Sequence, residues 1–189
     1  MSNVVSIDYF SKPGISASFL KSCSFSAWHG WKYLHEPFEP TAAMDFGSAV
    51  HCKLLEPQKF DSRFAVAQTK FDRRTKAGKE AAEAFEKEHA GKIVLTSDDG
   101  SRLSRIVESC LAIPIVKEAL TTFEKEKELD LGDFKGKLDL VDLKNRVIID
   151  VKTTRDATAR EFVSQSLSLR YDIQLFHYAQ LLGLGPMPT

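Results

Sequence analysis

The sequence predicts a mixed α/β (or α+β) fold, in which helices flank a central mixed β-sheet. Amphipathic helical segments fill much of the first half of the chain, strand-like segments follow at 123–130 and 134–153, and two helical segments close it. The order of helices, hairpin strands and helices indicates this class. Because 189 residues with 43% hydrophobic content can bury one sizeable core, we expect a single domain spanning residues 1–189.

Capping residues and apolar spacing place the helices. Ser16 can cap a helix that runs to about Cys23, and Thr41 can begin a second one that carries His51. Further helices are expected at 77–89, at 100–120 with an interruption at Pro114, at 156–167, and at 171–182, where Gly183 ends the last.

The apolar segment Val147–Lys152 carries two charged residues, Asp150 and Lys152. Successive side chains of a strand point to opposite faces, so Asp150 and Lys152 share one side while their apolar neighbours face the other. Burying two charges among apolar residues is costly unless they are paired or hold a cation. This pair is therefore a candidate site.

A second carboxylate, Asp139, lies in the preceding apolar segment, and residues 142–146 between the two segments read as a turn. The resulting hairpin would bring Asp139 and Asp150 to one place. Two carboxylates and a strand carbonyl are hard oxygen ligands that suit Mg²⁺ or Mn²⁺. Lys152 could orient or help to deprotonate an attacking water, or neutralise charge on a phosphorane-like transition state.

A simpler interpretation of the same pattern is a hairpin whose solvent face carries Lys137, Asp139, Asp150 and Lys152 as surface ion pairs. Such pairs contribute only about 0–1 kcal/mol each. The surrounding residues favour the site. Thr153 and Thr154 follow at once, and Gln174 and Tyr178 stand four residues apart on one face of a helical segment.

This set of residues resembles the PD-(D/E)xK nuclease superfamily, in the branch that carries a Gln-x-x-x-Tyr helix after the Asp-x-Lys strand. The segments Ile15–Lys21 and Ala43–Pro57 resemble the RecE-type phage exonucleases (exonuclease VIII). The resemblance implies a restriction-endonuclease-like core, the catalytic residues Asp139, Asp150 and Lys152, and a Mg²⁺ (or Mn²⁺) site formed by His51, Asp139, Asp150 and Val151. Leu138 replaces the proline usual before the first aspartate.

The same resemblance implies a metal-dependent exodeoxyribonuclease that hydrolyses linear double-stranded DNA from its ends in phage-type recombination. It also suggests a single-strand annealing protein as a partner and a homo-oligomeric assembly, and it gives Gln174 and Tyr178 a role in contacting the DNA backbone or supporting the metal site. The alternative is a non-catalytic, truncated nuclease-fold remnant that binds DNA or a protein partner. Proteins of this type usually continue with further strands, whereas here Gly183–Thr189 follow the last helix directly.

Charge adds local information only, since 26 basic and 26 acidic residues cancel. The segment 70–79 is basic, and its residues Arg73, Arg74 and Lys76 form either a solvated loop or phosphate contacts. One of the glutamates at 124–128 could be an additional metal ligand, although the sequence does not specify which.

The remaining features are consistent with a cytoplasmic protein. No apolar run reaches the roughly 18 residues of a membrane span, and the N-terminus has no basic-then-apolar signal. The three cysteines, Cys23, Cys52 and Cys110, are far apart. We expect them to be reduced thiols rather than metal ligands.

Overall fold

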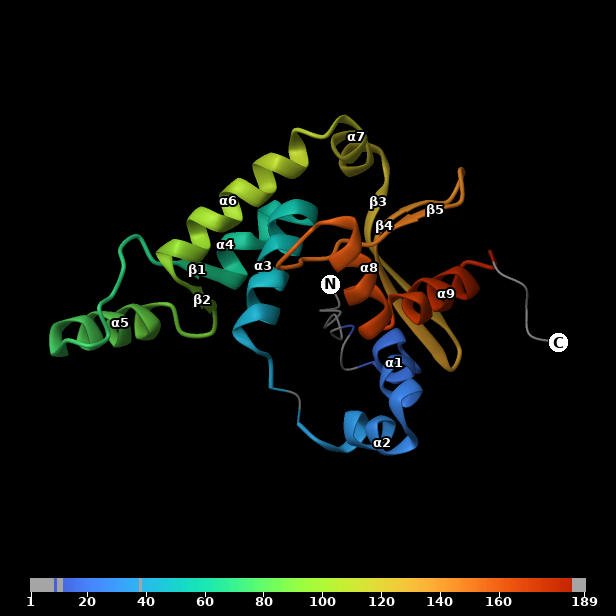
Figure 1. The fold of residues 1–189 in the computed structure, drawn as a ribbon, viewed down its shortest axis with the longest axis horizontal. Coiled ribbons are helices and arrows are strands. Elements are labelled where there is room, and N and C mark those ends of the chain that lie inside the picture. The colour runs from blue at the N-terminus through green and yellow to red at the C-terminus, as the bar shows by residue number, and fades with distance from the viewer. Residues whose placement is uncertain (1–8, 10–11, 38, 185–189) are drawn as a thin grey trace, which may run out of the picture. The chain divides into compact units, whose positions relative to one another are not determined.

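The computed structural model describes residue 9 and residues 12–37 and 39–184 (Figure 1). It confirms the α/β class, with helices and two small sheets. The chain forms two compact units: a first unit of residues 1–39 and 123–189, and a second unit of residues 40–122.

The first unit contains a three-stranded antiparallel sheet with the order β3-β4-β5. In Figure 1, the long β3–β4 hairpin is gold and α9 is red beside it. The elements of this unit are α1 (Ala17–Phe25), α2 (Ala27–His35), β3 (Glu124–Leu131), β4 (Phe134–Asp142), β5 (Val147–Ile149), α8 (Ala159–Ser168) and α9 (Tyr171–Leu181).

The predicted hairpin is present, although β5 is shorter than expected. The Asp142 carboxylate accepts a hydrogen bond from the backbone N–H of Asn145 at 3.0 Å and so closes the predicted turn. The strand ladder begins at Asp142 and Val147 and ends at Leu140 and Ile149. Beyond that point the backbone N–H of Val151 donates to the Asp139 carboxylate, so the segment after Ile149 is held by a side chain instead of a strand carbonyl.

The core of this unit lies where α9 covers β4. Leu138 and Val141 of β4 pack with Ala17 of α1 and with Tyr178 and Leu181 of α9. In the middle of β4, buried Gly136, Leu138 and Leu140 alternate with partly buried residues, and Lys135 and Val141 are buried as well. The close approach uses Gly136, since a Cβ atom there would lie 2.5 Å from Cδ1 of Leu181.

The predicted cap of α1 is confirmed, because the Ser16 hydroxyl accepts a hydrogen bond from the backbone N–H of Phe19. The residue before this cap is tied to the hairpin. Ile15 accepts from the backbone N–H of Lys135 at 3.0 Å and donates to the carbonyl of Asp133 at 2.7 Å. The start of α1 is therefore anchored to the beginning of β4.

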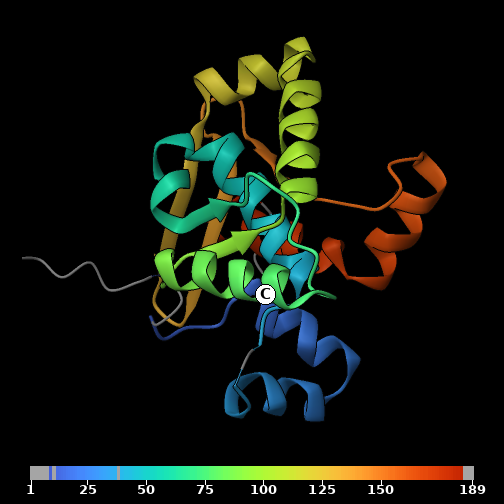
Figure 2. The same ribbon diagram turned by 90° about the vertical axis from the view of Figure 1, so that its left-hand side faces the viewer.

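The second unit packs helices around a two-stranded parallel sheet of β1 and β2, whose short arrows lie side by side in Figure 2. Its core centres on the buried face of α3, which carries Phe46, Ala49, Val50, Leu54 and Leu55. The elements are α3 (Ala42–Leu55), the 3-10 turn η2 (Pro57–Lys59), α4 (Phe60–Arg63), β1 (Phe64–Val66), α5 (Lys76–Glu88), β2 (Ile93–Leu95), α6 (Ser97–Leu111) and α7 (Pro114–Thr122).

Several observed helix boundaries agree with those predicted from the sequence. The side chain of Thr41 caps α3, the predicted break falls between α6 and α7 at Pro114, and Gly183, with a φ of 64°, follows the last helix. Five elements were not predicted, namely α2, η2, α4, β1 and β2. The two strands have three residues each, which is too short for an alternating pattern to stand out.

Within the described part of the chain, no helix is long and apolar enough to cross a membrane. The terminal segment 183–189 raised the question of missing strands. Its residues Gly185–Thr189 lie outside the described part of the chain.

Candidate functional site

Asp139 and Asp150, the two predicted carboxylates, lie together in the first unit. Asp139 is on β4 and Asp150 directly follows β5, the neighbouring strand. The Asp139 carboxylate accepts a hydrogen bond from the backbone N–H of Val151 at 2.7 Å. This bond holds the segment of Asp150 against β4.

Lys152 forms an ion pair with Asp150, which confirms that the two side chains share one side of the segment. The side chain of Asp150 is only 8% exposed and that of Lys152 20% exposed. The pair is therefore not a solvated surface pair, and its placement carries a desolvation cost. The ammonium group of Lys152 also lies 5.2 Å from the centre of the Tyr171 ring, within the range of a cation–π contact.

A chain of hydrogen bonds supports this contact. Thr154 donates from its hydroxyl to the side-chain carbonyl of Gln165 at 2.7 Å, and the amide nitrogen of Gln165 donates to the Tyr171 hydroxyl at 2.9 Å. The residues that follow the Asp-x-Lys segment thus fix the aromatic ring against which Lys152 lies.

Gln174, on α9, is buried at the centre of the site. Its amide nitrogen donates to Asp150 at 2.9 Å and to the Tyr178 hydroxyl at 3.0 Å, and its carbonyl accepts from the ammonium group of Lys21 at 3.1 Å. A carboxylate can only accept and an ammonium group can only donate, so these partners fix the orientation of the amide. Both amide hydrogens are used.

Tyr178 lies one helical turn after Gln174 and is also buried. Burial raises the pKa of Tyr178 far above its ordinary value; the Gln174 hydrogen bond partly offsets this, and the negative charges of Asp150 and Asp139 add to it. The phenol is therefore neutral at physiological pH and supports Gln174 as a hydrogen-bonding group.

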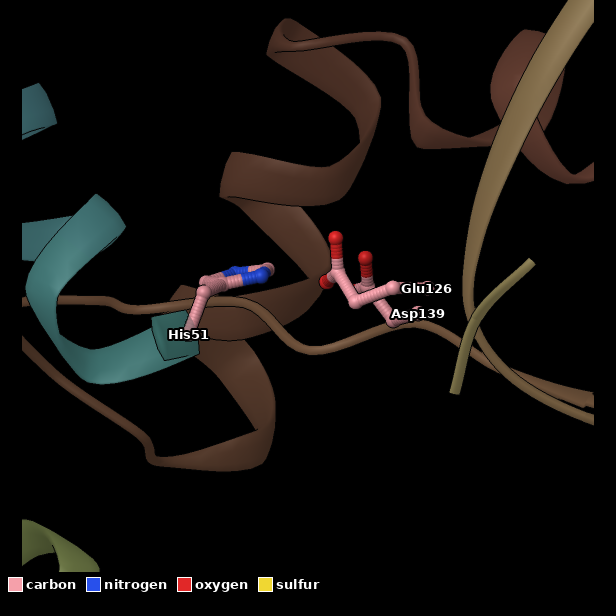
Figure 3. A group of neighbouring side chains, drawn as sticks. All are labelled: His51, Glu126 and Asp139. Carbon is pink, nitrogen blue, oxygen red and sulfur yellow. The ribbon is translucent and has the colours of Figure 1, made fainter. Parts of the chain in front are cut away.

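Glu126 is the glutamate of the 124–128 segment that the structure brings to Asp139. A carboxylate oxygen of each lies within 4.8 Å of the other, and Figure 3 shows the two side chains next to each other on adjacent strands. Glu126 has a φ of 50° in the middle of β3, a left-handed conformation that is uncommon for a residue with a side chain and frequent at functional sites. It forms an ion pair with Lys137.

The sequence indicated that one of the glutamates at 124–128 could be an additional metal ligand, but it did not indicate that this residue is Glu126. The register pairs Lys125 with Leu140 and Lys127 with Leu138, so Glu126 stands opposite Asp139. Strand alternation alone would also allow Glu124 and Glu128. These two form ion pairs elsewhere, with Lys127 and Lys12 respectively.

The donor set fits a hard divalent cation. Asp139, Asp150 and Glu126 offer carboxylate oxygens on a sheet and the segment that follows it, and Val151 offers a backbone carbonyl. Oxygen ligands of this kind, completed by waters, are those of Mg²⁺ and Mn²⁺. Partly buried carboxylates that lie near one another, such as Glu126 and Asp139, are unfavourable unless cations neutralise their charge.

The other predicted site residues belong to the second unit. His51, which Figure 3 also labels, lies on α3 and is partly buried. The basic residues at 73–76 form ion pairs within this unit, Arg73 with Glu86 at 2.5 Å, Arg74 with Asp72 at 2.9 Å, and Lys76 with Glu80 at 3.8 Å. Their roles as metal ligand and DNA contacts stay predictions.

Comparison with known families agrees with this geometry. The model of one family, described as a PDDEXK-like domain of unknown function (DUF3799), matches residues 16–184. The chain belongs to this family. The match includes every candidate site residue and supports a place in the PD-(D/E)xK nuclease superfamily, and with it a nuclease-type function. No curated protein matches the chain.

Proposed function

We propose that the protein is a metal-dependent exodeoxyribonuclease that hydrolyses linear double-stranded DNA, as its resemblance to the RecE-type phage exonucleases implies. The observation that carries the proposal is the arrangement of Asp139, Asp150 and Lys152. Asp139 holds the backbone of Val151, and Asp150 is paired with Lys152 while Gln174 donates to it. A module that only binds DNA has no need of such a costly, partly buried group of charges.

Asp139, Asp150, Glu126 and the carbonyl of Val151 would hold a Mg²⁺ or Mn²⁺ ion, and the resemblance adds His51 as a further ligand. When bound, the ion supplies positive charge that stabilises the developing negative charge on the phosphate. Removing about 20 kcal/mol from the barrier of phosphodiester hydrolysis is beyond a single general base, which contributes roughly 10²–10⁴ in rate.

The chain's own residues have separate roles in the reaction. A water oxygen adds to phosphorus, the bond from phosphorus to the leaving sugar oxygen breaks, and overall one proton of the water ends on that oxygen. Lys152 orients the water and offsets the charge that grows on the phosphate oxygens, because its ammonium group is held between Asp150 and Tyr171. Gln174 keeps Asp150 in place and Tyr178 keeps Gln174 in place.

Degradation of end-labelled DNA tests this function. The wild type should degrade a linear duplex in Mg²⁺ and leave a covalently closed circle intact, and EDTA should stop the reaction. Asp150→Asn should lose this activity, whereas Asp130→Asn, which changes an exposed carboxylate of β3, should retain it. Cleavage of the closed circle would identify an endonuclease instead. DNA binding without any cleavage would favour the non-catalytic alternative.

Double-stranded DNA ends are the substrate in this proposal. A single-strand annealing protein, as the consumer of the single-stranded tails, and a homo-oligomeric assembly are its proposed partners. Both follow from the resemblance.

A further inference from the structure

Lys21 is a positively charged residue at the site, and the proposed reaction gives it no role. It lies on α1, far in sequence from the hairpin, and its ammonium group donates to the side-chain carbonyl of Gln174 at 3.1 Å. Gln174 in turn donates to Asp150. Lys21 is thus one side chain away from a catalytic carboxylate.

The fold places Lys21 firmly. Ala17 and Lys21 are four residues apart and therefore share one face of α1. Ala17 is buried against Tyr178 and Leu181 of α9, and the residue before the helix cap is bonded to the hairpin. The face of α1 that carries Lys21 is consequently the one packed on the Gln174 helix.

The surroundings of Lys21 are unfavourable for a positive charge. Its pKa is lowered, first by burial and then by the positive charge of Lys152, and the negative charge of Asp150 only partly offsets these effects. Lys152 and Lys137 each form an ion pair with a carboxylate. Among the residues that the structure describes, Lys21 forms no such pair, and a neutral amide holds it.

Lys21 lies near a second cation, Lys152, and forms no ion pair with a carboxylate among the described residues. Its ammonium group could therefore bind an anionic ligand. The three ammonium groups of Lys21, Lys137 and Lys152 balance the formal charges of Glu126, Asp139 and Asp150. A divalent metal would then leave the site with a net positive charge. DNA phosphates are the anions that the proposed reaction brings to this place.

We propose that Lys21 binds a phosphate group of the DNA backbone at the site, with Gln174 holding its ammonium group in position. This inference rests on the proposed function for its substrate class. It separates two lysines by role: Lys152 acts on the reacting phosphate, and Lys21 contributes to holding the strand.

Binding and turnover of matched variants test the proposal. Lys21→Met keeps a long side chain and removes the charge, Lys21→Arg keeps the charge, and Lys144→Met removes an exposed lysine of the β4–β5 turn as a control. A fluorescent duplex without terminal phosphates is titrated in Ca²⁺ at several salt concentrations to obtain the dissociation constant. Cleavage in Mg²⁺ gives kcat and KM, and thermal unfolding is measured for each variant.

Lys21→Met should weaken duplex binding about tenfold and reduce the slope of log affinity against log salt by about 0.9, which corresponds to one lost phosphate contact. Its KM should rise more than its kcat falls, its melting temperature should stay close to that of the wild type, and Lys21→Arg should restore the slope. Lys144→Met should behave as the wild type.

An unchanged salt slope in Lys21→Met would overturn the proposal, and a lowered melting temperature would then assign Lys21 to packing. If Lys21→Met has an unchanged salt slope and still cleaves DNA, the proposed nuclease activity is retained and only the phosphate contact of Lys21 is rejected. If the wild type binds DNA and never cleaves it, the proposed activity fails, yet a reduced slope in Lys21→Met would still support the phosphate contact.

Discussion

Asp150 meets two different kinds of group, an amide and an ammonium group. One of its oxygens accepts from Gln174 at 2.9 Å and the other pairs with Lys152, while the proposed metal would draw on the same carboxylate. With so many partners, a single substitution here changes several contacts at once. Lys152 is the better residue for separating binding from chemistry, because its ammonium group contacts only Asp150 and the Tyr171 ring among the interactions described above.

At the scale of this residue, we expect Lys152→Ala to lose nearly all cleavage and to keep most of its affinity for duplex DNA. The ammonium group acts chiefly on charge that develops in the transition state, so its removal affects turnover more than binding. Single-turnover cleavage and duplex titration measure the two effects separately, with Lys144→Ala as the exposed control. Activity within about tenfold of the wild type, a barrier change of only roughly 1.4 kcal/mol, would remove Lys152 from the mechanism.

The packing of α9 on β4 is the feature at the scale of elements that positions the site. Gln174 and Tyr178 face the sheet on one side of α9, and Leu181 continues that face one turn later over Gly136. The glycine lets the helix approach the strand closely enough for Gln174 to reach Asp150. Any group that separates the two elements should disturb both stability and activity.

Gly136→Ala tests this packing. The new methyl group would lie 2.5 Å from Cδ1 of Leu181 and 3.4 Å from the Tyr178 ring, and overpacking of this kind costs about 1–3 kcal/mol. Chemical denaturation should show a lower free energy of unfolding. Adding Leu181→Ala to Gly136→Ala removes the atom in the way, so the double variant should lose less stability than the two single changes added together. Additive losses would mean that the contact does not limit the approach.

The whole molecule divides into two compact units, and the predicted ligands belong to both. Asp139, Asp150 and Glu126 are in the first unit and His51 is in the second. Metal binding should therefore be measured on the complete chain, and its effect on unfolding reports on all ligands together.

We expect Mg²⁺ or Mn²⁺ to raise the melting temperature of the wild type, because a ligand that binds only the folded state stabilises it by mass action. At a metal concentration of about one hundred times the dissociation constant, the gain is about 2.7 kcal/mol, or roughly 5–10 °C for a chain of this size. Asp150→Asn should show a much smaller rise and Asp130→Asn a full one. Equal shifts in the wild type and Asp150→Asn would sink the site assignment.

The same measurement decides the role of His51. If it is a ligand, His51→Ala should reduce the metal-induced rise and increase the metal concentration needed for half-maximal cleavage. If it is only a packed residue of α3, the substitution should lower the melting temperature equally with and without metal. That second result would leave Asp139, Asp150 and Lys152 in place and withdraw His51.

Local physical chemistry made much of the first unit predictable from the sequence. The turn at 142–146, the cap at Ser16, the shared side of Asp150 and Lys152 and the glycine after α9 all depend on residues a few positions apart. Period, caps and turn residues act over that distance, so the amino-acid sequence by itself determined the hairpin, the helices α1, α8 and α9, and a candidate site between Asp139 and Lys152.

Only the tertiary structure decided which distant residues join that site. The left-handed backbone of Glu126 and its place opposite Asp139 distinguish it from two equivalent glutamates, and Lys21 reaches Gln174 across 153 positions of sequence. The parallel pairing of β1 with β2 is of the same kind. Such contacts leave no local pattern in the sequence. They form when separate elements pack and when the register between strands is set, and both steps depend on residues that are far apart in the chain.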